Sequence, residues 1–73
     1  MRTLSQIRPG QEVRVLRLHG HGAVKRRLME MGLTRDAGVF VRKVAPLGDP
    51  IQISLRGYEL TLRRQDAESI EVT

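Results

Sequence analysis

Apolar and polar residues alternate through much of the second half of the chain. Ile51, Ile53 and Leu55 are separated by polar residues, and so are Leu60 and Leu62. A period of two gives a strand one apolar and one polar face, as in a half-buried antiparallel sheet. The pattern predicts two such strands, joined by a tight turn at residues 56–57.

Three further segments have a strand-like pattern: residues 12–19, 39–42 and 70–72. In the first of them the apolar face changes, because Val13 and Val15 share one side whereas Leu16 and Leu18 share the other. Such a change of phase indicates a β-bulge or a sharp curl, which small barrels use to close.

Residues 23–31 form the one segment with a clear helical period. Val24, Leu28 and Met31 follow i, i+4, i+7 spacing, which predicts a single buried stripe. Gly32 is expected to end the helix in a left-handed conformation, with Leu33 folding back on the last turn. On the outer face Arg26 and Arg27 are spaced to pair with Glu30. Residues 3–7 and 65–68 each predict one helical turn.

The segment between Val44 and Ile51 has the strongest loop signal. Pro46 and Pro50 lack a backbone N–H, so the strands on either side must stop here. Gly48 can supply the positive φ of a tight reversal. We therefore expect an ordered turn that projects Leu47 and Asp49 from the end of a hairpin.

These elements predict a single domain over residues 1–73. Five short antiparallel strands, one short α-helix and one or two helical turns favour a mainly β fold, a small SH3-like barrel. The chain has no cysteine, which excludes disulfides and thiolate zinc sites. It contains no segment with the ~20 apolar residues of a membrane span, so we expect a cytoplasmic protein without direct membrane insertion.

The net charge of +5 raises the question of a nucleic-acid partner. Basic residues are scattered over the predicted strands, and the only aromatic side chains are Phe40 and Tyr58, whereas single-strand binders stack bases on aromatics. A solvated surface or an acidic protein partner is favoured, and a basic nucleic-acid-binding barrel is kept as an alternative. Open strand edges also leave a homo-oligomer as an alternative.

Few residues suggest chemistry. His19 and His21 are weak metal candidates, since a stable site needs three or four ligands; exposed imidazoles in a glycine-rich entry to the helix are the simpler interpretation. The carboxylates are spread along the chain, and no serine lies in a nucleophile motif. We expect neither an enzyme nor a bound cofactor.

Four motifs extend over most of the chain: Leu4-x-x-Ile7-x-Pro9-Gly10, Arg27-Leu28-x-x-Met31-Gly32-Leu33, Val44-Ala45-Pro46-Leu47-Gly48-Asp49-Pro50-Ile51 and Leu60-x-Leu62-Arg63-Arg64-x-x-Ala67-x-x-Ile70-x-Val72. They resemble the FeoA family, the small cytoplasmic accessory proteins of bacterial ferrous iron uptake. The proline-rich run is the most specific of them. One departure is Asp36, which stands where the family usually has a glycine; Asp tolerates the left-handed region better than most residues.

The resemblance implies an SH3-like barrel that binds the cytoplasmic part of a FeoB-type membrane transporter with a GTPase domain, and modulates transport. A free-standing FeoA-like regulatory domain is the alternative, because FeoA-like domains also occur fused to repressors of the DtxR type. Loops and exposed charges set partner choice, which gives these expected contact residues: Lys25, Arg26, Arg27, Glu30, Leu47, Gly48 and Asp49. A narrower version makes Arg26 or Arg27 an arginine finger for the GTPase.

Overall fold

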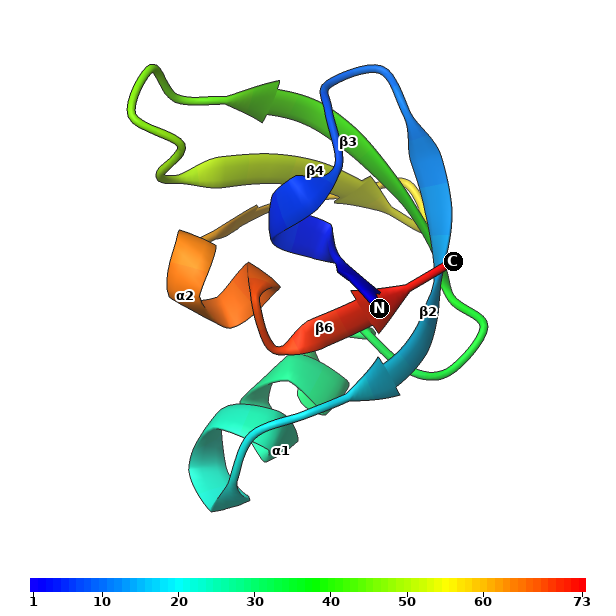
Figure 1. Cartoon of the computed structure of the whole chain (residues 1–73). Helices are drawn as coiled ribbons and strands as arrows, with labels where there is room; N and C mark the ends of the chain where they lie inside the picture. Colours follow the sequence, from blue (N-terminus) through cyan, green and yellow to red (C-terminus); the bar gives the residue numbers. More distant parts are fainter.

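The computed structural model describes all of residues 1–73 and contains six strands, two α-helices and one 3-10 turn (Figure 1). In chain order they are β1 (Arg2–Thr3), η1 (Leu4–Gln6), β2 (Glu12–Leu18), α1 (Gly22–Glu30), β3 (Gly38–Val44), β4 (Ile51–Leu55), β5 (Tyr58–Leu62), α2 (Arg64–Ala67) and β6 (Ile70–Val72). All five predicted strands are present, and both predicted helical turns form as η1 and α2. The two-residue strand β1 was not expected.

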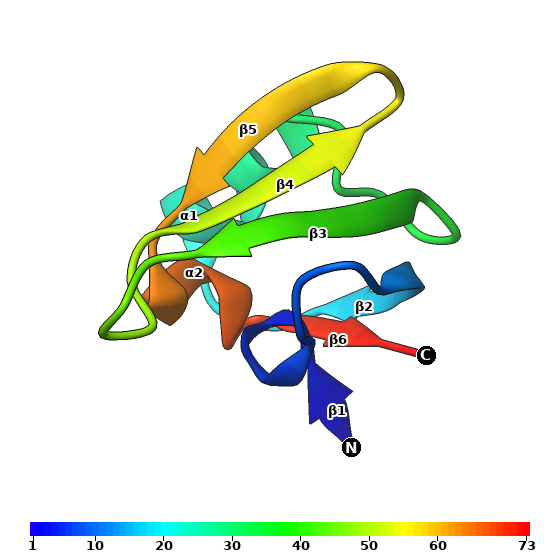
Figure 2. The same ribbon diagram turned by 90° about the horizontal axis from the view of Figure 1, so that it is seen from above.

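The six strands pair antiparallel in the order β1-β6-β2-β3-β4-β5. The sheet curls so that β3, β4 and β5 face β2 and β6 across the interior (Figure 2), and η1 and α2 lie next to one another. Arg56 and Gly57 both have positive φ and form the tight turn between β4 and β5, as predicted. The mainly β barrel is therefore confirmed.

The predicted irregularity in β2 is also present. The pairing of β2 with β6 shifts register between Val15 and Arg17. Val15 and Leu18 are buried on either side of the shift, whereas Leu16 and Arg17 face outward. An extra residue in one strand bends it and rotates the following side chains, so Leu16 is the residue that the bulge turns toward solvent.

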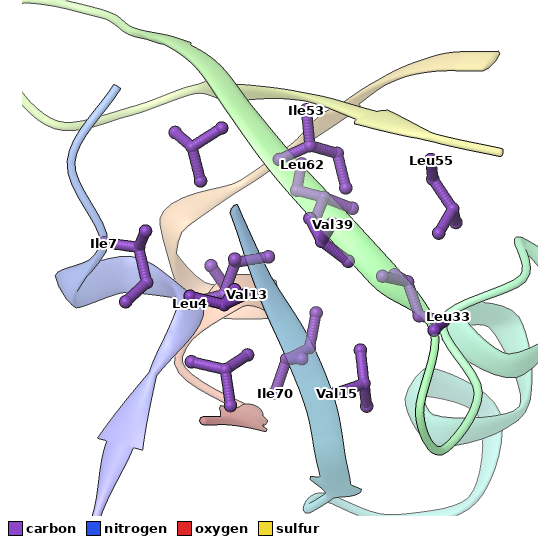
Figure 3. Close-up of a cluster of buried hydrophobic side chains, with 14 of the residues drawn as sticks. Leu4, Ile7, Val13, Val15, Leu33, Val39, Ile53, Leu55, Leu62 and Ile70 are labelled. Carbon is purple, nitrogen blue, oxygen red and sulfur yellow. The ribbon is translucent and has the colours of Figure 1, made fainter. Parts of the chain in front are cut away.

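Seventeen apolar residues form one buried core, and no polar or charged side chain is buried with them. Figure 3 shows aliphatic side chains from η1, the curled sheet and the segment after α1 converging on this interior, among them Leu4, Val15, Leu33, Ile53 and Ile70. Because the core is purely apolar, specific recognition must depend on the surface.

The buried stripe predicted for α1 is only partly correct. Leu28 is fully buried and Met31, just after the helix, is partly buried, but Val24 is 40% exposed. The helix lies beyond one end of the barrel (Figure 1), and its one buried residue, Leu28, lies in its C-terminal half. Val24 belongs to the preceding turn of the helix, which contributes no buried residue.

The end of α1 has the geometry that the sequence predicted. Gly32 adopts φ 101°, and its N–H donates to the carbonyl of Met29 at 3.0 Å. The N–H of Leu33 donates to the carbonyl of Leu28 at 3.1 Å, which completes a Schellman motif. The nine-residue α1 is the longest helix, and no helix has the length and apolar character required to cross a membrane.

Candidate interaction surface

The β3–β4 loop, residues 45–50, is an ordered turn. The N–H of Ala45 donates to the carbonyl of Pro50 at 3.0 Å, and the N–H of Gly48 donates to the carbonyl of Ala45 at 2.7 Å. Gly48 has φ 83°, the positive value expected for it. At the tip, Leu47 is 90% exposed, more than any other large hydrophobic side chain of the protein. The loop thus presents one aliphatic side chain on a fixed backbone.

Asp49 is exposed at this loop, and its carboxylate also bonds to another element. Its Oδ1 accepts a hydrogen bond at 3.1 Å from the backbone N–H of Arg64, the first residue of α2. The first N–H groups of a helix have no partner within the helix, so a carboxylate from another segment can cap them. Asp49 therefore fastens the loop to α2 while it remains exposed at the surface.

The predicted pairing of Arg27 with Glu30 is wrong. The guanidinium of Arg27 instead donates from Nη2 to Oδ1 of Asp66, in α2, at 2.9 Å. Lys25, Arg26 and Glu30 are exposed and form no ion pair. Since α2 bonds to α1 through Asp66 and to the loop through Arg64, it lies between the two halves of the predicted contact surface (Figure 1). The expected residues form two neighbouring patches rather than one.

A groove between α1 and β2 was not predicted. The first of its two adjoining hollows has a volume of about 250 Å³ and is lined by Leu16, Arg17, Leu18, Lys25, Met29, Thr34 and Arg35. The second lies along α1 and is lined by Gly22, Lys25, Arg26, Met29, Glu30 and Thr34. We call these residues together the α1–β2 groove. Three of the predicted contact residues, Lys25, Arg26 and Glu30, line it.

Local structure explains how the groove forms. The β2 bulge turns Leu16 outward, and burial of Leu28 leaves its neighbour Met29 on the solvent side of α1; these two side chains are 41% and 49% exposed. The turn that follows α1 is held against β2 because Val15 exchanges backbone hydrogen bonds with residues 36 and 37, at 2.7 and 2.9 Å. This arrangement places Arg35 at the groove. In the sequence, the change of phase in residues 12–19 is the feature that indicates an outward-facing Leu16.

The two histidines have different surroundings. His19 Nε2 lies 2.9 Å from Glu71 Oε1, which links the end of β2 to β6. His21 is the exposed residue that precedes α1. Glu71 could not be recognised from the sequence as the partner of His19, because it lies 52 residues further along the chain. No group of three or more His, Cys, Asp or Glu side chains is placed to hold a metal ion.

The chain is similar in sequence to known proteins of one family. The model of the FeoA domain matches residues 2–73. A fusion of Fe(2+) transport protein A with the Fe(2+) transporter FeoB, from Porphyromonas gingivalis, is 36% identical over 69 residues; these are 94% of this chain but only 8% of the fusion protein. The chain is thus similar to a small part of that relative.

Solved structures show the same fold. The solution NMR structure of the FeoA protein from Chlorobium tepidum is 44% identical, with a TM-score of 0.89 over 97% of this chain and 68% of that one. A zinc complex of FeoA from Stenotrophomonas maltophilia, reported as an SH3 domain protein, is 23% identical with a TM-score of 0.89, covering 100% and 91% of the chains. This second likeness shows the fold alone, and it agrees with the predicted SH3-like barrel. From the match over residues 2–73 and the 36% identical relative, we conclude that the chain belongs to the FeoA family.

Proposed function

We propose that this chain is an accessory protein of bacterial ferrous iron uptake that binds the cytoplasmic part of a FeoB-type transporter and modulates transport. The observation that carries the proposal is the relative from Porphyromonas gingivalis, in which a domain similar to this whole chain is joined to FeoB. Covalent fusion keeps two modules at high effective concentration, which is useful when they act on one another.

The surface of the chain is consistent with a role in binding. Leu47 is held by the hydrogen-bonded β3–β4 loop, so its insertion into a partner pocket costs little further ordering of the chain. The α1–β2 groove offers a second exposed region, with the expected contact residues Lys25, Arg26 and Glu30 in its lining. Residues held on a rigid scaffold are the usual location of binding sites.

Co-purification tests the proposal. The tagged chain is mixed with the detergent-solubilised FeoB-type transporter of the same organism, without nucleotide, with GDP and with a non-hydrolysable GTP analogue. We expect retention of the transporter in at least one of these states. Absence of retention in all three, with both proteins folded, would reject the proposal.

A matched pair of variants locates the contact. Leu47→Ser removes the exposed side chain at the tip of the β3–β4 loop and should weaken retention about tenfold or more, as for a central apolar contact residue. Tyr58→Ser removes another exposed side chain, 73% accessible, at the start of β5, and should leave retention unchanged; Tyr58 pairs with Leu55, at the end of β4 opposite to the loop. Equal effects of the two substitutions would show that the loop is not a specific contact.

A further inference from the structure

The α1–β2 groove combines an apolar floor with basic walls. Leu16 and Met29 are its two exposed apolar side chains, and Arg17, Lys25 and Arg35 line the same hollow. We propose that this groove binds an acidic amphipathic segment of the partner protein: a short stretch with one large aliphatic or aromatic side chain flanked by carboxylates. The inference rests on the proposed function in one respect, since it assigns this segment to the transporter.

The floor of the groove suits a single apolar side chain. Leu16 and Met29 come from different elements, β2 and α1, and still expose nearly half of their surface. Burial of apolar surface on binding is favourable. Methionine is unbranched and adapts its shape, so it can fit around an incoming side chain. The floor therefore provides affinity without strict shape selection.

The charges around the groove specify an acidic partner. No acidic side chain lines the first hollow, and neither Arg17, Lys25 nor Arg35 takes part in an ion pair. Three arginines elsewhere on the surface are paired, in Arg27–Asp66, Arg42–Glu59 and Arg64–Glu68, whereas Arg8, Arg14, Lys43, Arg56 and Arg63 are also without an ion pair. The groove differs from these scattered cations because its three unpaired charges line one hollow together with exposed apolar side chains, where carboxylates of a partner would meet them.

One acidic side chain, that of Glu30, lines the α1–β2 groove. Glu30 lines only the second hollow, together with Arg26 and Gly22, and does not line the first. A bound segment would therefore place its carboxylates beside Arg17, Lys25 and Arg35. RNA would also meet these cations, but the groove has no aromatic side chain on which a base could stack. The apolar floor favours a peptide.

A synthetic peptide tests the chemistry of the groove independently of the transporter. The probe is a 12-residue peptide with a central leucine flanked by glutamates, titrated into the ¹⁵N-labelled chain at low salt. We expect the amide signals of residues 16–18, 25–30 and 34–35 to shift, with an affinity that falls as salt is added. The same peptide with its leucine replaced by serine, or its glutamates by glutamine, should bind at least tenfold more weakly.

Two charge-matched double variants give the control. R17E/R35E reverses charge in the groove, and R8E/R14E makes the same change outside it; each lowers the net charge from +5 by four units, to +1. We expect R17E/R35E to weaken peptide binding at least tenfold and R8E/R14E to leave it within twofold. Equal weakening by both would mean that only overall charge matters, which overturns the proposal.

The apolar floor has its own matched pair on α1. Met29→Gln removes a groove side chain, and Val24→Gln removes a residue of similar exposure outside the groove. We expect only Met29→Gln to weaken peptide binding. As a control, a thermal unfolding curve is measured for each variant to check that it is folded. A poly(U) oligonucleotide is titrated in parallel; if it shifts the groove signals and the peptide does not, the proposal is wrong.

Co-purification with the transporter separates this inference from the proposed function. If the wild-type chain retains the transporter and R17E/R35E does not, both are supported. If R17E/R35E retains it as well as R8E/R14E does, the groove is not the contact, and the inference fails while the proposed function stands. If the wild-type chain binds the peptide in the groove but never retains the transporter, the proposed function fails, and with it the assignment of the acidic segment to the transporter.

Discussion

Leu28 is the only residue of α1 that is fully buried, so replacing it tests how the helix is held. Leu28→Ala at a buried site costs about 2 to 5 kcal/mol. A domain of 73 residues has a total stability of about 4 to 11 kcal/mol at the usual 0.05 to 0.15 kcal/mol per residue. One side chain therefore controls a large share of the total.

The loss should affect α1 before it affects the barrel. An isolated nine-residue helix is marginal in water, and without Leu28 only the partly buried Met31, just beyond the helix, remains as an apolar anchor. At 1.4 kcal/mol per factor of ten, 2 to 5 kcal/mol corresponds to roughly 30- to 4,000-fold faster amide exchange. Hydrogen–deuterium exchange followed by NMR measures this directly. We expect the increase in α1, with a smaller one in β3 and β4.

The matched control is Val24→Ala on the same helix. Because Val24 is 40% exposed, its removal should change stability by no more than about 0.5 kcal/mol, and alanine is the better helix former. Two results would contradict the expectation that Leu28 alone holds α1 against the barrel. If Val24→Ala cost as much as Leu28→Ala, both side chains would be buried; if Leu28→Ala accelerated exchange equally in α1 and in the central strands, α1 would not be held separately.

Two further predictions concern backbone geometry. Asp49→Ala removes the acceptor for the N–H of Arg64 and should destabilise the fold by about 0.5 to 2 kcal/mol, whereas Asp49→Asn keeps an acceptor oxygen and should cost less; thermal unfolding compares them, and equal losses would argue against capping. Asp36 has φ 69°, so Asp36→Ala should lower the free energy of unfolding by about 1 kcal/mol while Asp36→Gly should be better tolerated. Urea unfolding measures this difference, and equal stability of the two variants would contradict it.

The sequence alone predicts those structural features that depend only on residues close together along the chain. The period of two in residues 51–55 predicts β4, and the change of phase after Val15 predicts the bulge. The glycines at 32 and 48 predict turns that require positive φ. These features follow from strand periodicity and from the sterics of φ and ψ, which act over a few residues. The motifs that resemble FeoA follow the same elements, and so the family could be predicted before the fold was known.

The contacts of the surface side chains were decided by the tertiary structure. Asp49 bonds to Arg64, Arg27 to Asp66 and His19 to Glu71, over separations of 15, 39 and 52 residues. Spacing within a helix predicted a partner for Arg27 in the same helix, but the fold brought a partly buried carboxylate closer. The α1–β2 groove exists because a bulge and a short helix, each predictable alone, lie beside one another. Which polar groups meet depends on how separate elements pack, and period and propensity carry no information about that.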